Sequence, residues 1–171
     1  MIFIKKLCFY LALAAATLNF SGCQTTPPPA EPEKKAGLSA EQTTALQQQG
    51  FVESDEGWEF SASEKLLFGA NEATLQANAK EAVGRIARLL VKLEIPAVRV
   101  DGHTDSTGSA SYNDQLSLRR AQIVADVIIA AGMSSSHVTV RGLGSRSPIA
   151  GNNTAEGRAQ NRRVVLVIGN N

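Results

Sequence analysis

Cysteine and histidine are scarce in this chain. Its 171 residues include two cysteines, Cys8 and Cys23, and two histidines, His103 and His137. A disulfide framework needs several cysteines at regular spacings, and a structural zinc site needs four cysteine or histidine ligands close together. The sequence therefore predicts neither a disulfide-stabilised fold nor a metal site, and no motif in it indicates a cofactor.

An excess of charge of either sign is also missing. The chain has 17 Lys and Arg residues against 16 Asp and Glu residues, so its formal net charge is +1. A domain that binds nucleic acid through its phosphates carries a strong positive field. We therefore expect no nucleic acid among the partners.

Motifs of nucleophilic catalysis are absent as well. His103 and Asp105 stand two positions apart at the end of an expected strand, but no Gly-x-Ser-x-Gly sequence is present. Nothing in the sequence fixes a serine against the histidine. We expect no catalytic residue and no enzyme, and a structural hydrogen bond is the simplest role for His103.

Residues 1–22 have the pattern of a lipoprotein signal peptide. Lys5 and Lys6 precede an apolar run, too short to span a bilayer comfortably, that stops at Phe20 and is followed by Ser21-Gly22-Cys23. This end resembles a bacterial lipobox, although Phe20 stands where an aliphatic residue is usual. The resemblance predicts lipidation at Cys23; the alternative is an ordinary signal peptide with an incidental cysteine.

Processing at Cys23 has consequences for location. The mature chain would lose Lys5 and Lys6, so its formal charge would change from +1 to −1, and each acyl methylene would add ~0.8 kcal/mol of membrane binding. Gln24 follows the cysteine, whereas lipoproteins kept at the inner membrane usually have aspartate there. By this resemblance, we expect an outer-membrane lipoprotein that faces the periplasm.

Two segments separate the lipid from the main domain. Residues 23–37 hold the lipidated cysteine and a tether with four prolines, which would extend ~3.1 Å per residue and reach ~40 Å. Residues 38–56 are expected to form a linker segment, in which Ser39 and Gln42 indicate a capping box and a short helix. Its apolar content predicts only weak contact with a core.

Residues 57–169 suit one domain. Strands alternate with amphipathic helices, which predicts an α/β (α+β) two-layer sandwich with one mixed sheet and helices packed on one face. The linker helix and a hairpin precede it. The expected strands are 57–60 and 65–68, paired as the hairpin, then 98–103, 137–141 and 163–168, and the expected helices are 77–93 and 111–131.

Opposite charges flank a glycine-containing loop after the 98–103 strand. Asp105 offers a fixed carboxylate, and Arg120 offers a planar guanidinium from the following helix. Together they suit a zwitterion, with an amine bound to Asp105 and a carboxylate bound to Arg120. An internal salt bridge between them is the alternative. Gly108 would let backbone amides approach the ligand closely.

The sequences GHTDSTGSASYNDQLSLRRAQIVADVI and RGLGSRSPIAGNNTAEGRAQNRRVVLVI resemble the OmpA-like peptidoglycan-binding domain, with a match over about 58–168. The resemblance implies that Asp105 and Arg120 grip meso-diaminopimelate in the peptide stem of peptidoglycan. It also implies that Gly108 and nearby amides complete the site and that Asn71 adds a hydrogen bond. Either of the two adjacent arginines would line the pocket or support the aspartate: these are Arg162 and Arg163.

The N-terminal half carries a second resemblance. The sequences GLSAEQTTALQQQGF, DEGWEF and LLFG are similar to lipoproteins of a cyclic-di-GMP signalling system. In that system the lipoprotein captures the periplasmic repressor YfiR, which frees the diguanylate cyclase YfiN. Leu46, Phe51 and Trp58 are the expected partner surface, unless Phe51 and Trp58 merely cover a sheet edge. A purely structural wall anchor is the alternative function, and a homodimer is left open.

Overall fold

The computed structural model describes residues 37–69 and 74–169, so the expected leader, Cys23, the tether up to residue 36 and Asn71 lie outside it. The strands are β1 (Val52–Ser54), β2 (Gly57–Ser63), β3 (Val98–His103), β4 (Val138–Gly142) and β5 (Arg163–Ile168). The helices are α1 (Ala40–Gln48), α2 (Glu64–Phe68), α3 (Ala77–Lys92), α4 (Ala110–Ala130) and α5 (Ala155–Asn161), with a 3-10 turn at Ser135–His137.

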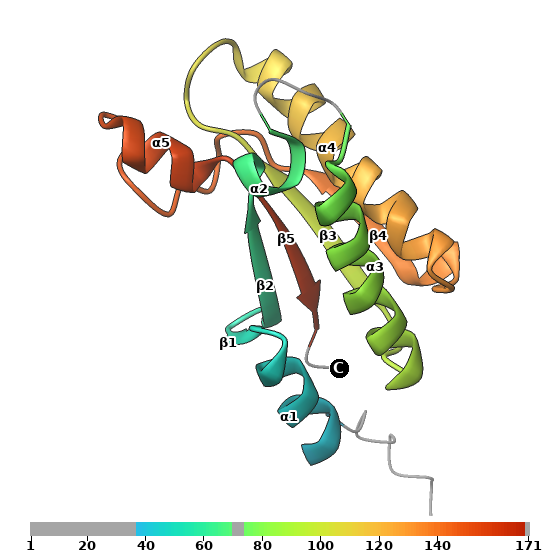
Figure 1. The fold of residues 1–171 in the computed structure, drawn as a ribbon. Coiled ribbons are helices and arrows are strands. Elements are labelled where there is room, and N and C mark those ends of the chain that lie inside the picture. Colours follow the sequence, from blue (N-terminus) through green and yellow to red (C-terminus); the bar gives the residue numbers. More distant parts are fainter. Residues whose placement is uncertain (1–36, 70–73, 170–171) are drawn as a thin grey trace, which may run out of the picture. The chain divides into compact units, whose positions relative to one another are not determined.

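These strands form one five-stranded sheet in the order β1-β2-β5-β3-β4. Strands β3 and β4 are parallel and are joined by α4, whereas the other neighbouring pairs are antiparallel. Helices α3 and α4 lie side by side on one face of the sheet (Figure 1). The expected two-layer sandwich with a mixed sheet is confirmed.

The core lies between the two helices and that face. The apolar stripe of α3 contributes Val83, Ile86 and Leu90, and the strands contribute alternate residues such as Val100 and Leu166. Residues three and four positions apart lie on one face of a helix, and alternate residues lie on one face of a strand, so these side chains meet in one layer. Within residues 37–69 and 74–169, every helix is too short or too polar to cross a lipid bilayer.

Of the two strands predicted for the hairpin, the first is correct and the second is wrong. Strand β2 pairs with β1, with Val52 opposite Glu59, whereas Lys65–Phe68 belongs to α2. Ser63 caps this helix, because its hydroxyl accepts a hydrogen bond from the backbone N–H of Leu66 at 3.4 Å. A short apolar run does not by itself distinguish a strand from a helix.

The linker packs more tightly than its composition predicts. The capping box of Ser39 and Gln42 is confirmed, but the expectation of weak core contact is wrong, because Leu46 is 0% exposed. Phe51 and Trp58 are 3% and 5% exposed. The three expected partner residues are thus core residues in this conformation, and none of them is free at the surface.

Helix α4 approaches β3 so closely that Gly102 has no room for a side chain. A Cβ atom at Gly102 would lie 2.0 Å from the backbone oxygen of Ser117. Gly84 in α3 is different, because a Cβ there would meet only the flexible end of Arg88, at 3.3 Å. Alanine substitutions at Gly102 and Gly84 should therefore change the free energy of unfolding in opposite directions.

We expect Gly102→Ala to lower the free energy of unfolding by ~1–3 kcal/mol, because α4 must move away from the sheet. Gly84→Ala is the matched control and should raise it by ~0.5–1 kcal/mol, because alanine is the better helix former. Urea unfolding followed by circular dichroism measures both values. Equal effects of the two substitutions would contradict the close approach at Gly102.

Candidate functional site

The strand register gathers polar residues at one end of the sheet. Ser63 of β2 and His103 of β3 both stand opposite Arg163 of β5. The next residues outward from this row are Glu64 and Arg162, and the loop after β3 continues to Asp105. Residues that are about 40 to 100 positions apart in the sequence therefore meet at this edge because β5 lies between β2 and β3.

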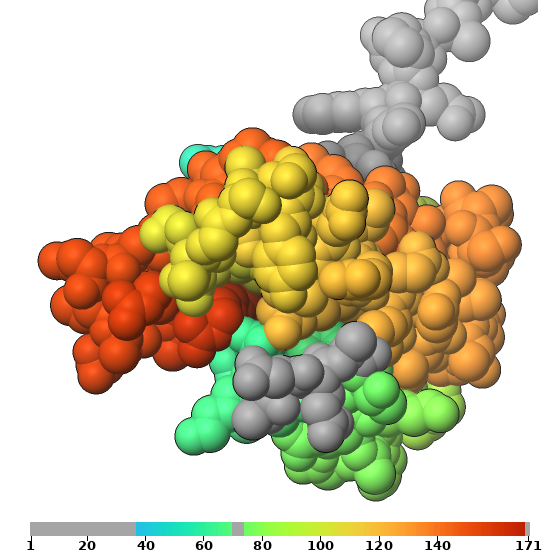
Figure 2. All heavy atoms as spheres, turned by 90° about the horizontal axis from the view of Figure 1, so that it is seen from above, coloured from blue at the N-terminus to red at the C-terminus, as the bar shows by residue number. Residues whose placement is uncertain are grey.

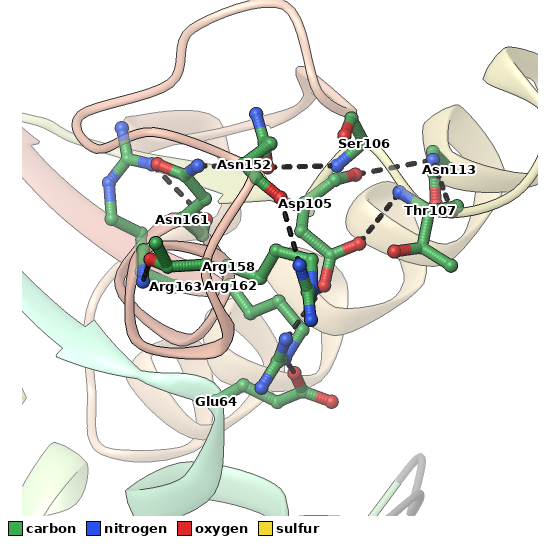
Figure 3. Close-up of polar contacts among 12 residues, drawn as sticks. Glu64, Asp105, Ser106, Thr107, Asn113, Asn152, Arg158, Asn161, Arg162 and Arg163 are labelled. Carbon is green, nitrogen blue, oxygen red and sulfur yellow. Dashed lines mark hydrogen bonds and ion pairs between the residues drawn. The ribbon is translucent and has the colours of Figure 1, made fainter.

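Four side chains at this edge form a chain of alternating charge, in the order Asp105, Arg162, Glu64 and Arg120. Asp105 Oδ2 accepts from Arg162 Nη1 at 2.7 Å, and Arg162 Nε donates to Glu64 Oε2 at 2.6 Å. Glu64 Oε1 in turn accepts from Arg120 Nη2. Figure 3 shows Glu64, Asp105 and Arg162 in this arrangement. Asp105 and Arg120 are therefore linked through two intermediates rather than by the direct salt bridge that the sequence left open.

The chain of charges borders a cavity of about 940 Å³. Loop and helix segments around 104–120, α5 and α2 surround it, and Figure 2 shows this end of the molecule from above. Helix α4 turns Asn113, Leu116 and Arg120 toward it at intervals of three and four residues. Among the described residues, five cations and two carboxylates line the walls: Lys65, Arg119, Arg120, Arg158 and Arg162 with Glu64 and Asp105.

Asp105 is held in its charged form. Burial disfavours the carboxylate, but hydrogen bonds from Arg162 and from Thr107 more than offset this, so the pKa of Asp105 lies below its ordinary value. The Thr107 backbone N–H donates to Asp105 Oδ1 at 2.8 Å, which is a local turn typical of aspartate. The same pair raises the pKa of Arg162, chiefly through the hydrogen bond to Asp105.

Arg120 is buried beneath the cavity wall. It is 6% exposed, and its guanidinium carbon lies 5.6 Å from the ring centroid of Phe68, a favourable cation–π position. Among the residues that the structure describes, its buried Nε has no hydrogen-bond partner. Arg120 therefore has one buried N–H group that is not satisfied by the described residues, and the residue itself lines the cavity.

The loop around residues 150–152 supports the loop that carries Asp105 through hydrogen bonds. Asn161 binds the backbone of Ala150 through both its amide nitrogen, at 2.8 Å, and its amide oxygen, at 3.0 Å. Asn152 accepts from Asn161 and from the backbone N–H of Ser106, at 3.0 and 3.1 Å (Figure 3). Buried amide networks of this kind fix the geometry of nearby loops.

Of the other predicted site residues, some line the cavity and some do not. Arg162 lines the cavity, whereas Arg163 is turned elsewhere and donates to the carbonyls of Asn161 and Ser147, each at 3.2 Å. Gly108, with φ +90°, shapes the loop before α4 but is not part of the cavity wall. Asn71 lies outside the described residues.

His103 also lies away from the cavity. Burial and the nearby Arg163 lower the pKa of His103 to about 4, and in the described part of the chain its Nδ1 has no hydrogen-bond partner. The structural hydrogen bond expected for His103 is therefore not found at Nδ1. No cluster of three or more potential metal ligands occurs among the residues described.

The sequence analysis missed Glu64, Asn113 and Arg158 at the site. Glu64 was hidden by the interpretation of its segment as a hairpin, although Ser63 followed by Glu-Lys is a usual start of a helix. Asn113 and Arg120 share one helical face, which the spacing of seven could have indicated. Arg158 sits on α5, a helix with little apolar periodicity.

Comparisons with known proteins identify the family of this chain. Residues 67–162 match the OmpA family. The outer-membrane lipoprotein YfiB of Pseudomonas aeruginosa is 47% identical over 92% of this chain and 90% of its own length. The peptidoglycan-binding protein ArfA of Mycobacterium bovis is 44% identical over 60% of this chain and 32% of its own.

A solved structure extends the comparison to the fold. The peptidoglycan-associated lipoprotein from Burkholderia pseudomallei aligns with a TM-score of 0.55 at 25% sequence identity, over 63% of this chain and 87% of that chain. The family match covers more than half of the sequence, and the TM-score shows a similar fold. The chain therefore belongs to the OmpA family.

Proposed function

We propose that this chain is a lipid-anchored outer-membrane protein that faces the periplasm, binds peptidoglycan through diaminopimelate, and captures a YfiR-like repressor. Capture would activate a diguanylate cyclase and raise cyclic-di-GMP. Residues 1–22 are then the leader, 23–37 the lipidated tether, 38–56 the regulatory linker and 57–169 the binding domain. The protein holds its ligand without chemical turnover.

One observation carries the peptidoglycan part of this proposal. Asp105 and Arg120 border the same cavity, and Arg120 keeps a buried Nε without a partner among the described residues. A ligand with an amine beside a carboxylate fits a site that offers both a carboxylate and a guanidinium. Two of the relatives compared above are named for peptidoglycan, which supports the same ligand class.

A titration tests this part. A muropeptide that contains meso-diaminopimelate is added to the soluble domain, and binding is followed by calorimetry and by amide shifts of residues 104–120. We expect saturable binding with the largest shifts at the cavity, and an unchanged muropeptide by chromatography afterwards. No binding would overturn the proposed ligand, and a cleaved muropeptide would overturn the binding-only role.

A second observation supports repressor capture. Leu46 is the one buried residue of α1, and the remaining tie from this helix to α3 is a hydrogen bond from Gln42 Nε2 to the Leu93 carbonyl at 2.8 Å. Release of α1 has to break the packing of Leu46 and this hydrogen bond, and binding of a partner to the exposed surface would offset that cost. Detachment would expose Leu46 and Phe51, and large apolar side chains are typical interface anchors.

Tension transmitted through the tether would be the cause of this detachment. Its ~40 Å reach would let the domain contact the wall while the lipid stays in the membrane, so envelope stress would pull on the linker. A structural wall anchor of the peptidoglycan-associated type remains the alternative. Binding of a YfiR-like repressor by the released linker separates the two functions, because a structural anchor needs no such partner.

A further inference from the structure

Glu64 is a carboxylate that lies between two of the cavity arginines, Arg120 and Arg162. Its two side-chain oxygens accept from Arg120 and Arg162 respectively, and its backbone N–H donates to the Arg162 carbonyl at 2.9 Å. The side chain is 12% exposed. Since both main chain and side chain are fixed, Glu64 is a permanent part of the cavity wall.

Lys65, Arg119 and Arg158 make the cavity lining positive as a whole, and Glu64 sets the charge immediately beside Arg120. Glu64, Asp105, Arg120 and Arg162 together carry no net charge, and both carboxylates bind the same guanidinium, that of Arg162. A ligand carboxylate that approaches Arg120 also approaches Glu64, because the two side chains are in contact. Like charges at such a distance repel strongly in a partly water-excluded site.

We propose that Glu64 makes the cavity select a ligand that carries an amine beside its carboxylate over a ligand with the carboxylate alone. This inference rests on the proposed peptidoglycan function and names the residue that sets its specificity. Glu64 already gives Arg120 a carboxylate, so a second lone carboxylate gains little and is repelled. A zwitterion brings its own positive group, which Glu64 and Asp105 attract.

Two tripeptides that differ in one group test the selection. The first is L-Ala-γ-D-Glu-meso-diaminopimelate, and the second has 2-aminopimelate in the last position and so lacks only the distal amine. The dissociation constants of both are measured for the wild type, Glu64→Gln, Glu64→Asp and Glu81→Gln. The ratio of the two constants within each variant is the readout, so a small loss of folded protein cancels.

We expect the wild type to prefer the amine-bearing tripeptide by at least about tenfold. Glu64→Gln keeps the size and removes the charge, so it should reduce this preference by about tenfold, mainly because the amine-free tripeptide binds better. Glu64→Asp keeps the charge and should keep most of the preference. Glu81→Gln removes the partner of Arg85 on the exposed face of α3, outside the cavity wall, and should change nothing.

The outcomes separate this inference from the function on which it rests. If the wild type binds the amine-bearing tripeptide and Glu64→Gln retains the full preference, the role of Glu64 is wrong and the peptidoglycan function stands. Loss of preference in Glu64→Asp as well as in Glu64→Gln would indicate a purely structural role. If the wild type binds neither tripeptide, the peptidoglycan function itself is wrong.

Discussion

Asp105→Ala is expected to weaken muropeptide binding by ~2–5 kcal/mol, which is a loss of roughly 30-fold or more. The substitution removes the carboxylate that we propose as the acceptor for the ligand amine. It also leaves Arg162 with one carboxylate partner instead of two, so the cavity gains positive charge at the place where the amine would bind.

Two further variants show which part of this effect is electrostatic. Asp105→Asn keeps the size of the side chain and loses its charge, so we expect most of the loss to persist. Asp126→Ala is the matched control, because Asp126 lies on the exposed face of α4 with Gln122 as its neighbour, at 2.8 Å. Calorimetric titration gives each affinity, and wild-type affinity in Asp105→Ala would contradict the proposed site.

Leu46→Pro is expected to release α1 and raise repressor binding. Proline in a helix interior costs ~3 kcal/mol, and this change also removes the side chain through which α1 enters the core, which is 0% exposed. The released segment would present Phe51 and neighbouring apolar groups. A pull-down with a purified YfiR-like repressor, quantified against the wild type, measures the gain.

Ala40→Pro is the control for this experiment. Ala40 is the first residue of α1, next to the capping Ser39, and proline is well tolerated at a first helical position. It should leave both the helix and repressor binding unchanged. An equal gain in both variants, or none in Leu46→Pro, would argue against a hidden capture surface.

The longer elements of this fold could be predicted because their patterns repeat. Helix α3 buries six positions on one face over 16 residues, and β5 is a continuous apolar run after Arg163 that its central place in the sheet explains. Helix α2 has five residues, too few for a helical period to stand out from a strand. Its cap was the better signal.

The site divides along similar lines. Asp105 and Arg120 are close in sequence, so a loop followed by a helix was enough to bring them to one place. Glu64 is 56 residues from Arg120, and their contact depends on the pairing of β2 with β5. Local patterns do not contain that pairing. The burial of Leu46 likewise depends on contacts with distant segments, which composition alone underestimated.

The place of β5 in the sheet has a consequence for how the protein reaches its folded state. This strand is the last one in the described part of the chain, yet it separates β2 from β3 and pairs with both. A chain that has emerged from a translocation pore only as far as residue 162 therefore holds two half-sheets with no partner between them. Contacts between distant segments form late and slowly. The sheet therefore closes only after β5 has emerged, and until then the polypeptide can pass through the pore unfolded.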